Sequence, residues 1–115
     1  RGKLDVTVIK DDNAYLGDHK TGKVREDPFE LEVQAVLLHA KHPHLTKIVG
    51  QFFWLSEVRP GPIHDVSNTR KTWDGIHQTV EAMEADRTTN QWEKRDGPLC
   101  KWCDVLDCEK NRNQK

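Results

Sequence analysis

The chain has 115 residues, of which 32% are charged, and its formal net charge is −1. A chain of this length buries one modest core, and its mean hydropathy of −0.84 excludes a membrane-spanning stretch. The near-zero net charge neither favours nor excludes nucleic acid as a partner. Residues 1–20 alternate charged with apolar residues, unlike a secretory signal, and the sequence begins with Arg1 rather than Met. We therefore expect a cytoplasmic protein whose chain is a fragment or a processed product.

The first predicted elements are two strands, 3–10 and 14–21, which form a hairpin around a turn-forming Asp-Asp-Asn segment. Two registers remain open. With a two-residue turn, Asp5 lies opposite Lys20 and diagonal to Asp18. With a four-residue loop, Asp5 lies directly opposite Asp18. Both registers keep the three polar side chains on one face of the hairpin, because side chains alternate along a strand.

A helix is predicted over residues 28–41. Asp27 suits the N-cap, Pro28 suits the first helical position, and Glu30 completes a capping box. The helix stops before Pro43. Its apolar residues cover much of its circumference, as expected for a helix that packs on a sheet.

The rest of the predicted core follows in three elements. Residues 46–57 form a nearly continuous apolar run, which favours a central strand buried on both faces. Pro-Gly-Pro at 60–62 breaks the chain, and residues 63–69 are predicted to form a short edge strand. A second helix is expected over 71–87, with apolar residues at helical spacing that predict core contacts. This stripe consists of Trp73, Ile76, Val80 and Met83.

These elements predict an α/β fold with a small mixed β-sheet, formed by the hairpin and the central strand and flanked by the two helices. The chain is long enough for one such domain. We expect the core of this domain to occupy residues 1–90 and a cysteine-bearing C-terminal tail of the same domain to occupy residues 91–115.

The tail holds all three cysteines of the chain, Cys100, Cys103 and Cys108, within nine positions. An odd number of cysteines does not form a disulfide framework, and their close spacing predicts a metal in a reducing cytoplasm. A two-residue gap lets two thiolates bind one ion or cluster. A tetrahedral zinc needs a fourth ligand, which His64 or His77 can supply, whereas a [4Fe–4S] cluster normally needs four thiolates.

The polar residues of the hairpin suit one kind of chemistry. Asp18 and Lys20 leave the same face of a strand, and Asp5 is supplied by the preceding strand. Two carboxylates hold a divalent metal, and an ammonium group activates water or stabilises the charge that develops on phosphate. This combination predicts hydrolysis of a phosphodiester bond. His19 alternates with Asp18 and Lys20, so its ring faces the other side, where packing is expected.

The order of these features resembles the PD-(D/E)XK nuclease superfamily, and within it the RecB-type branch that includes phage and CRISPR-associated exonucleases. The cysteine tail is similar to the cluster that closes many members of that branch. The resemblance runs from Gly2 to Cys108, although residues 56–90 match in layout only. It rests on the motifs Gly2-x-x-Asp5, Asp18-His19-Lys20-Thr21-Gly22, Gln34 in a following helix, and Gly97 to Cys108.

The resemblance implies a restriction-endonuclease-like core and a Mg²⁺- or Mn²⁺-dependent deoxyribonuclease, most similar to an exonuclease of phage origin acting in the host cytoplasm. It implies DNA as partner, with a homo-oligomer or a phage recombination protein as further partners, and an iron–sulfur cluster or Zn²⁺ at the cysteines. A structure-specific endonuclease and a non-catalytic DNA-binding module with the same fold are the alternatives. The implied site consists of Asp5, Asp18 and the backbone carbonyl of His19 as metal ligands, Lys20 and Gln34 as catalytic residues, and Thr21, Lys23 and Arg25 as substrate-binding residues.

The sequence departs from the family pattern at three places. Relatives carry a tyrosine four residues after the glutamine, where this chain has Leu38. Relatives also carry an upstream helix with a glutamate or histidine that completes the metal site. Because this sequence begins shortly before Asp5, we expect either a preceding segment with that helix or a substitute, such as Glu32 facing the sheet. Finally, the iron–sulfur members have four cysteines, and this chain has three.

Overall fold

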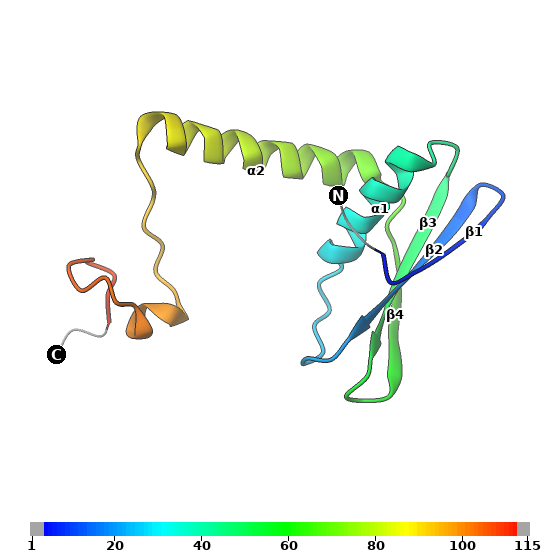
Figure 1. Cartoon of the computed structure of the whole chain (residues 1–115), viewed down its shortest axis with the longest axis horizontal. Coiled ribbons are helices and arrows are strands. Elements are labelled where there is room, and N and C mark those ends of the chain that lie inside the picture. Colours follow the sequence, from blue (N-terminus) through cyan, green and yellow to red (C-terminus); the bar gives the residue numbers. More distant parts are fainter. Residues whose placement is uncertain (1–3, 113–115) are drawn as a thin grey trace. The chain divides into compact units, whose positions relative to one another are not determined.

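The computed structural model describes residues 4–112, and the chain forms two compact units, residues 1–79 and 80–115. The first unit is an α/β structure with four strands and the helix α1 (Figure 1). Helix α2 crosses from the first unit into the second, which also contains a short 3₁₀ helix, η1. The elements are β1 Val6–Lys10, β2 Asn13–Lys20, α1 Phe29–Lys41, β3 Lys47–Trp54, β4 Arg59–Asp65, α2 Thr69–Thr89 and η1 Pro98–Trp102.

The four strands form one mixed sheet in the order β1-β2-β3-β4. The pairs β1/β2 and β3/β4 are antiparallel, whereas β2 and β3 are parallel. Parallel neighbours require a crossover connection, and α1 provides it. The predicted α/β class and mixed sheet are therefore confirmed. Gly2 and the predicted first residue of the hairpin, Lys3, lie outside the described residues.

The hairpin register decides where the polar residues meet. Lys10 faces Asn13 across the β1–β2 ladder, and a continuation of the same ladder places Asp5 opposite Asp18. This is the second of the two predicted registers. The connection is shorter than expected, with two turn residues instead of four, and the first of them, Asp11, has a φ of 55°. Aspartate tolerates this left-handed conformation better than most residues do.

The core of the first unit lies between α1 and one face of the sheet. Helix α1 contacts β2 and β3, and its buried residues are Leu31, Ala35 and Leu38, one helical turn apart from each other (Figure 1). Opposite them, the sheet buries alternate residues of its two inner strands. The buried apolar cluster is completed by Ala14, Leu16, Leu45, Ile48, Phe52, Trp54 and Val66.

The central strand β3 is less buried than its sequence predicts. Ile48, Phe52 and Trp54 are buried on the side of α1, whereas Val49 and Phe53 on the other side are only half-buried. The prediction of burial on both faces was therefore wrong. The apolar run is continuous in sequence, but α1 packs on one face only, so the residues of the opposite face keep part of their exposure.

The prediction for β4 was also wrong in its position. Residues 60–62 do not break the chain but lie inside β4, which pairs with β3 from Arg59 to Asp65. An edge strand tolerates proline because one of its sides needs no ladder hydrogen bonds. The ladder is irregular between Gln51 and Phe53, opposite these prolines.

Helix α2 is longer than predicted, and it buries none of its described side chains. Trp73, Val80 and Met83 are 52%, 49% and 56% exposed, so the predicted core contacts were wrong. Helical spacing shows that these side chains share a face of the helix, but it does not show that another element covers that face. None of the helices in residues 4–112 combines the length and apolar character needed to cross a membrane.

The packing of α1 on the sheet depends on a glycine. A Cβ atom added at Gly50 would lie 3.1 Å from Cδ2 and 3.2 Å from Cβ of Leu31, both in the core. We predict that Gly50→Ala lowers the free energy of unfolding by roughly 1–3 kcal/mol, because added volume strains a well-packed interface. Urea denaturation followed by circular dichroism measures this change.

Gly75→Ala is the matched control, since Gly75 lies in α2 and nothing lies within 4 Å of an added Cβ. Alanine is the better helix former, so this variant should gain about 0.5–1 kcal/mol. Equal stability of the Gly50→Ala variant and the natural protein would contradict the packing described for α1.

Candidate active site

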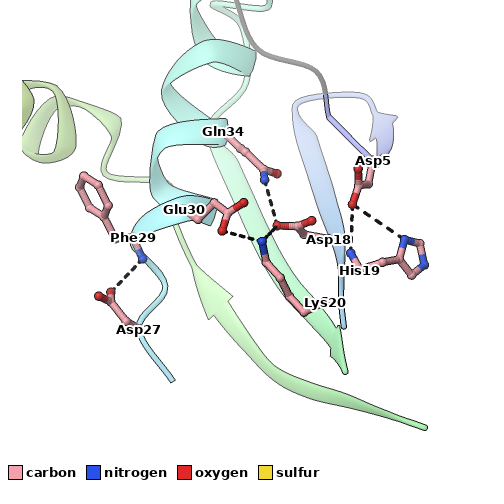
Figure 2. A network of polar contacts seen from close by, with 8 residues as sticks. All are labelled: Asp5, Asp18, His19, Lys20, Asp27, Phe29, Glu30 and Gln34. Carbon is pink, nitrogen blue, oxygen red and sulfur yellow. Dashed lines mark hydrogen bonds and ion pairs between the residues drawn. The ribbon is translucent and has the colours of Figure 1, made fainter. Parts of the chain in front are cut away.

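The candidate site lies at the carboxyl end of β2, where the helix α1 begins. In α/β sheets, ligands bind at the carboxyl ends of strands. Asp18 and Lys20 project from β2 toward α1, on the same face as the buried Leu16. Figure 2 shows the two side chains pointing toward Glu30 and Gln34 of α1. The site is therefore formed by one strand and the helix that follows it.

Asp18 is the centre of a polar network. The residue is 5% exposed, and its Oδ2 accepts a hydrogen bond of 3.3 Å from Nε2 of Gln34. The same oxygen lies 3.2 Å from Nζ of Lys20. A buried carboxylate is stable only when donors surround it, so Lys20 and Gln34 are needed to hold Asp18 in its charged form. The predicted association of these three residues is present in the structure.

Asp5 reaches the same point from the neighbouring strand. Its Oδ2 accepts a hydrogen bond of 3.1 Å from the backbone N–H of His19. A hydrogen bond with the carboxyl group of Asp18 lowers the pKa of Asp5. Burial, and then the same contact with Asp5, raises the pKa of Asp18. The two carboxyl groups thus shift each other's pKa in opposite directions, and two acids on facing strands can bind one cation.

His19 contacts Asp5 through its backbone N–H and also through its ring, whose Nδ1 lies 4.0 Å from Oδ2 of Asp5. Its ring points away from Asp18 (Figure 2) and stacks on Phe53 with 5.6 Å between the ring centroids. This agrees with the packing expected for it. Because the N–H and C=O of a strand residue point the same way, the His19 carbonyl is directed toward the edge where Asp5 lies. That carbonyl is the atom predicted to bind metal.

Lys20 makes its shortest contact with Glu30, which the sequence predicted to be part of a capping box. Its Nζ lies 2.6 Å from Oε2 of Glu30. The hydrogen bond that Lys20 donates to Glu30, and then the one that it donates to Asp18, raises the pKa of Lys20. Lys20 is therefore an ammonium ion at neutral pH. Of the two roles open to it, stabilising negative charge on phosphate suits this protonation state better than taking a proton from water.

The predicted capping box was wrong, because α1 begins at Phe29 with Pro28 as its N-cap and has no side-chain cap hydrogen bond. Oδ1 of Asp27 accepts a hydrogen bond of 3.0 Å from the backbone N–H of Phe29, which forms an Asx turn just before the helix. Glu30 does not complete the box but binds Lys20 instead. The signal that identifies Glu30 is its spacing, since it precedes Gln34 by four residues and so shares its helix face. Glu32, expected as a substitute acid, lines a different hollow.

A hollow of about 410 Å³ opens beside Lys20. Lys23 and Arg25, predicted to bind substrate, line it together with Phe29 and Glu30. Its volume falls in the range of small-ligand sites. Thr21, the third predicted substrate-binding residue, is exposed and is not among the residues that line this hollow.

The three cysteines lie in the second unit. They are free and half-buried, and all three line one hollow of about 450 Å³. The backbone around them is held by Asn111, whose Nδ2 donates hydrogen bonds to the carbonyls of Cys103 (3.0 Å) and Val105 (2.6 Å). His64 and His77, considered as fourth ligands, belong to the first unit. Within residues 4–112, no three His, Cys, Asp or Glu side chains converge closely enough to enclose an ion.

The donor atoms near Asp5 and Asp18 nevertheless suit one class of metal. Two carboxylates and a backbone carbonyl are hard oxygen ligands, which Mg²⁺ and Mn²⁺ prefer. Mg²⁺ keeps several waters and is held by one or two carboxylates, so a third acid is not required. In addition, Oε1 of Gln34 is buried without a hydrogen-bond partner among the described residues. A buried polar atom of this kind fits a site completed by water or a ligand.

Comparisons with known proteins give one similarity. The sequence matches no protein-family model, and no solved structure matches it. It is similar to a phage protein, "Gene 69 protein" of Mycobacterium phage D29, with 26% identity over 108 residues. The aligned region covers 91% of this chain and 40% of the phage protein, so the chain spans about two fifths of that protein's length.

The opposite pKa shifts of Asp5 and Asp18 give a direct prediction. In Asp5→Asn, an amide that donates a hydrogen bond replaces the carboxyl partner, so the charged form of Asp18 is stabilised and its pKa should fall. Carbon-13 NMR titration of the aspartate carboxyls measures this shift. Asp11→Asn is the control, because Asp11 lies in the hairpin turn, where asparagine also tolerates the positive φ. An unchanged Asp18 titration in Asp5→Asn would show that the two carboxyls do not interact.

Proposed function

We propose that this protein is a metal-dependent deoxyribonuclease of the PD-(D/E)XK superfamily, with a restriction-endonuclease-like core. The observation that carries the proposal is geometric. The hairpin register sets Asp5 opposite Asp18, and the Asp18 carboxylate lies 3.2 Å from the Lys20 ammonium. Two acids and one permanent cation at the carboxyl end of β2 suit the cleavage of a phosphodiester, whose transition state gains negative charge.

Each residue has a defined role in this proposal. Asp5, Asp18 and the His19 carbonyl would hold Mg²⁺ or Mn²⁺, which when bound supplies a water of lowered pKa and neutralises charge on the phosphate oxygens. Lys20, held in its charged form, binds a non-bridging phosphate oxygen. Gln34 orients Asp18 through its hydrogen bond of 3.3 Å and keeps the carboxylate aligned with Asp5.

The order of the elements supports the same proposal. The acids and the lysine come from a hairpin, the glutamine comes from the helix that follows, and the next strand pairs in parallel with β2. This is the arrangement that the resemblance to the superfamily implies. The similarity to a protein of Mycobacterium phage D29 is in line with a phage origin, and we propose an exonuclease that acts on DNA in the host cytoplasm, alone or with a recombination partner.

A non-catalytic DNA-binding module is the second candidate, and one observation favours it. No third His, Cys, Asp or Glu side chain joins Asp5 and Asp18 in a metal-binding group within the described residues. A nuclease cleaves DNA when Mg²⁺ or Mn²⁺ is added, whereas a non-catalytic module leaves the DNA intact. A structure-specific endonuclease differs from an exonuclease in cutting closed circular DNA as well as linear DNA.

We also propose that the cysteine tail is a structural metal site. The supporting observation is that Cys100, Cys103 and Cys108 form no disulfide and line a single hollow. Zinc or an iron–sulfur cluster there would fix the tail and take no part in cleavage, with a fourth ligand from outside these three cysteines.

The lysine provides the test of the proposed activity. Lys20→Ala should lower the rate of degradation of linear duplex DNA in Mg²⁺ or Mn²⁺ by at least about 100-fold, the scale of losing one preorganised electrostatic contact. Lys47→Ala is the matched control, because Lys47 pairs with Asp65 at 2.6 Å, outside the site. If the Lys20→Ala and Lys47→Ala variants degrade DNA equally fast, the role assigned to Lys20 is wrong.

A further inference from the structure

The ion pair between Lys20 and Glu30 has a feature that the proposed cleavage does not use. Lys20 is shared between two carboxylates, but these differ in their surroundings. Asp18 is buried and bound by Gln34 as well, whereas the Glu30 side chain is 56% exposed. Lys20 provides the one side-chain contact found for the Glu30 carboxylate among the described residues. An exposed ion pair of this kind contributes little free energy, so it can be exchanged for another anion at small cost.

The surroundings of Glu30 favour such an exchange. The hollow beside Lys20 is also lined by Lys23 and Arg25, and neither forms an ion pair with a carboxylate of residues 4–112. The carboxylate of Asp27, which lines the same hollow, is engaged by the N–H of Phe29. When Glu30 leaves Lys20, three cations face one hollow.

We propose that Glu30 occupies, in the free protein, the position on Lys20 that a phosphate group of a nucleic-acid strand takes when it enters this hollow. The inference rests on the proposed function for the identity of the ligand. Figure 2 shows the geometry: Asp18 reaches Lys20 from the strand, and Glu30 reaches it from the first turn of α1. A phosphate oxygen replaces the Glu30 carboxylate on Nζ, Lys23 and Arg25 bind the neighbouring charge, and the Lys20–Asp18 contact stays intact.

The exposed ring of Phe29 adds a contact for the same ligand. Phe29 is 53% exposed and lines this hollow as well as the hollow that Glu32 lines. Aromatic rings beside cations bind unpaired bases by stacking while the cations follow the backbone. A single-stranded end therefore suits the hollow better than a free phosphate ion does.

The test compares two glutamates of the same helix. The probe is a short fluorescein-labelled single-stranded DNA in EDTA, so that binding is measured by anisotropy without cleavage. Glu30→Gln should tighten binding by about two- to fivefold, the range that corresponds to one exposed ion pair. Glu32→Gln removes the same charge from the same helix, but Glu32 lines a different hollow. Its dissociation constant should stay close to that of the natural protein.

A double-mutant cycle makes the test specific for Lys20. In a Lys20→Ala background, Glu30→Gln should have no effect on binding, because the cation for which the carboxylate and the phosphate compete is gone. Weaker binding by Glu30→Gln, or equal tightening by Glu30→Gln and Glu32→Gln, would overturn the proposal.

Failure of the proposed function is distinguished by cleavage in Mg²⁺. If Glu30→Gln tightens DNA binding but the natural protein does not cut DNA in Mg²⁺, the exchange of Glu30 for phosphate is supported and the proposed nuclease activity is wrong. If the natural protein cuts DNA but Glu30→Gln leaves DNA binding unchanged, the nuclease proposal is supported and the exchange of Glu30 for phosphate is wrong.

Discussion

The register of the β1–β2 hairpin is the constraint on which the site depends. Lys10 pairs with Asn13 across a two-residue turn, and this pairing sets Asp5 opposite Asp18. Side chains alternate along a strand, so a slip of one residue would turn Asp5 to the other face and leave Asp18 without its acidic partner. The turn therefore controls chemistry at the far end of the hairpin, with Asp11 in the conformation that permits this short connection.

Burial of Asp18 links that register to the helix. A carboxylate on a residue that is 5% exposed needs donors, and Lys20 and Gln34 supply them from β2 and α1. The same contacts set the charge states of the site, because burial and Asp5 raise the pKa of Asp18 while Glu30 and Asp18 raise that of Lys20. Asp18, an acid with a raised pKa, therefore lies beside Lys20, a permanent cation. This arrangement suits the binding of a metal ion and a phosphate group.

Local patterns predicted the elements that carry the site, and they failed where the outcome depends on distant neighbours. Alternation identified the hairpin, and capping chemistry placed the start of α1 within one residue. The exposure of Trp73 could not be predicted, because spacing defines a helix face and not what covers it. Glu30 was assigned to a cap because its local spacing fits a capping box. Its contact with Lys20, ten residues earlier, depends on how α1 packs on β2 and cannot be read from local spacing. Pro60 was predicted to break the chain because an edge strand cannot be recognised without its partner.

The central claim is that Asp5 and Asp18 together bind a divalent cation, and calorimetric titration with Mn²⁺ tests it most directly. We expect saturable binding at neutral pH that Asp18→Asn abolishes and that weakens as the pH falls through the raised pKa of Asp18, because protons and metal compete for the same carboxylates. Asp74→Asn, which alters an exposed pair in α2, should bind as the natural protein does. Absence of Mn²⁺ binding, or binding that Asp18→Asn leaves unchanged, would contradict the claim.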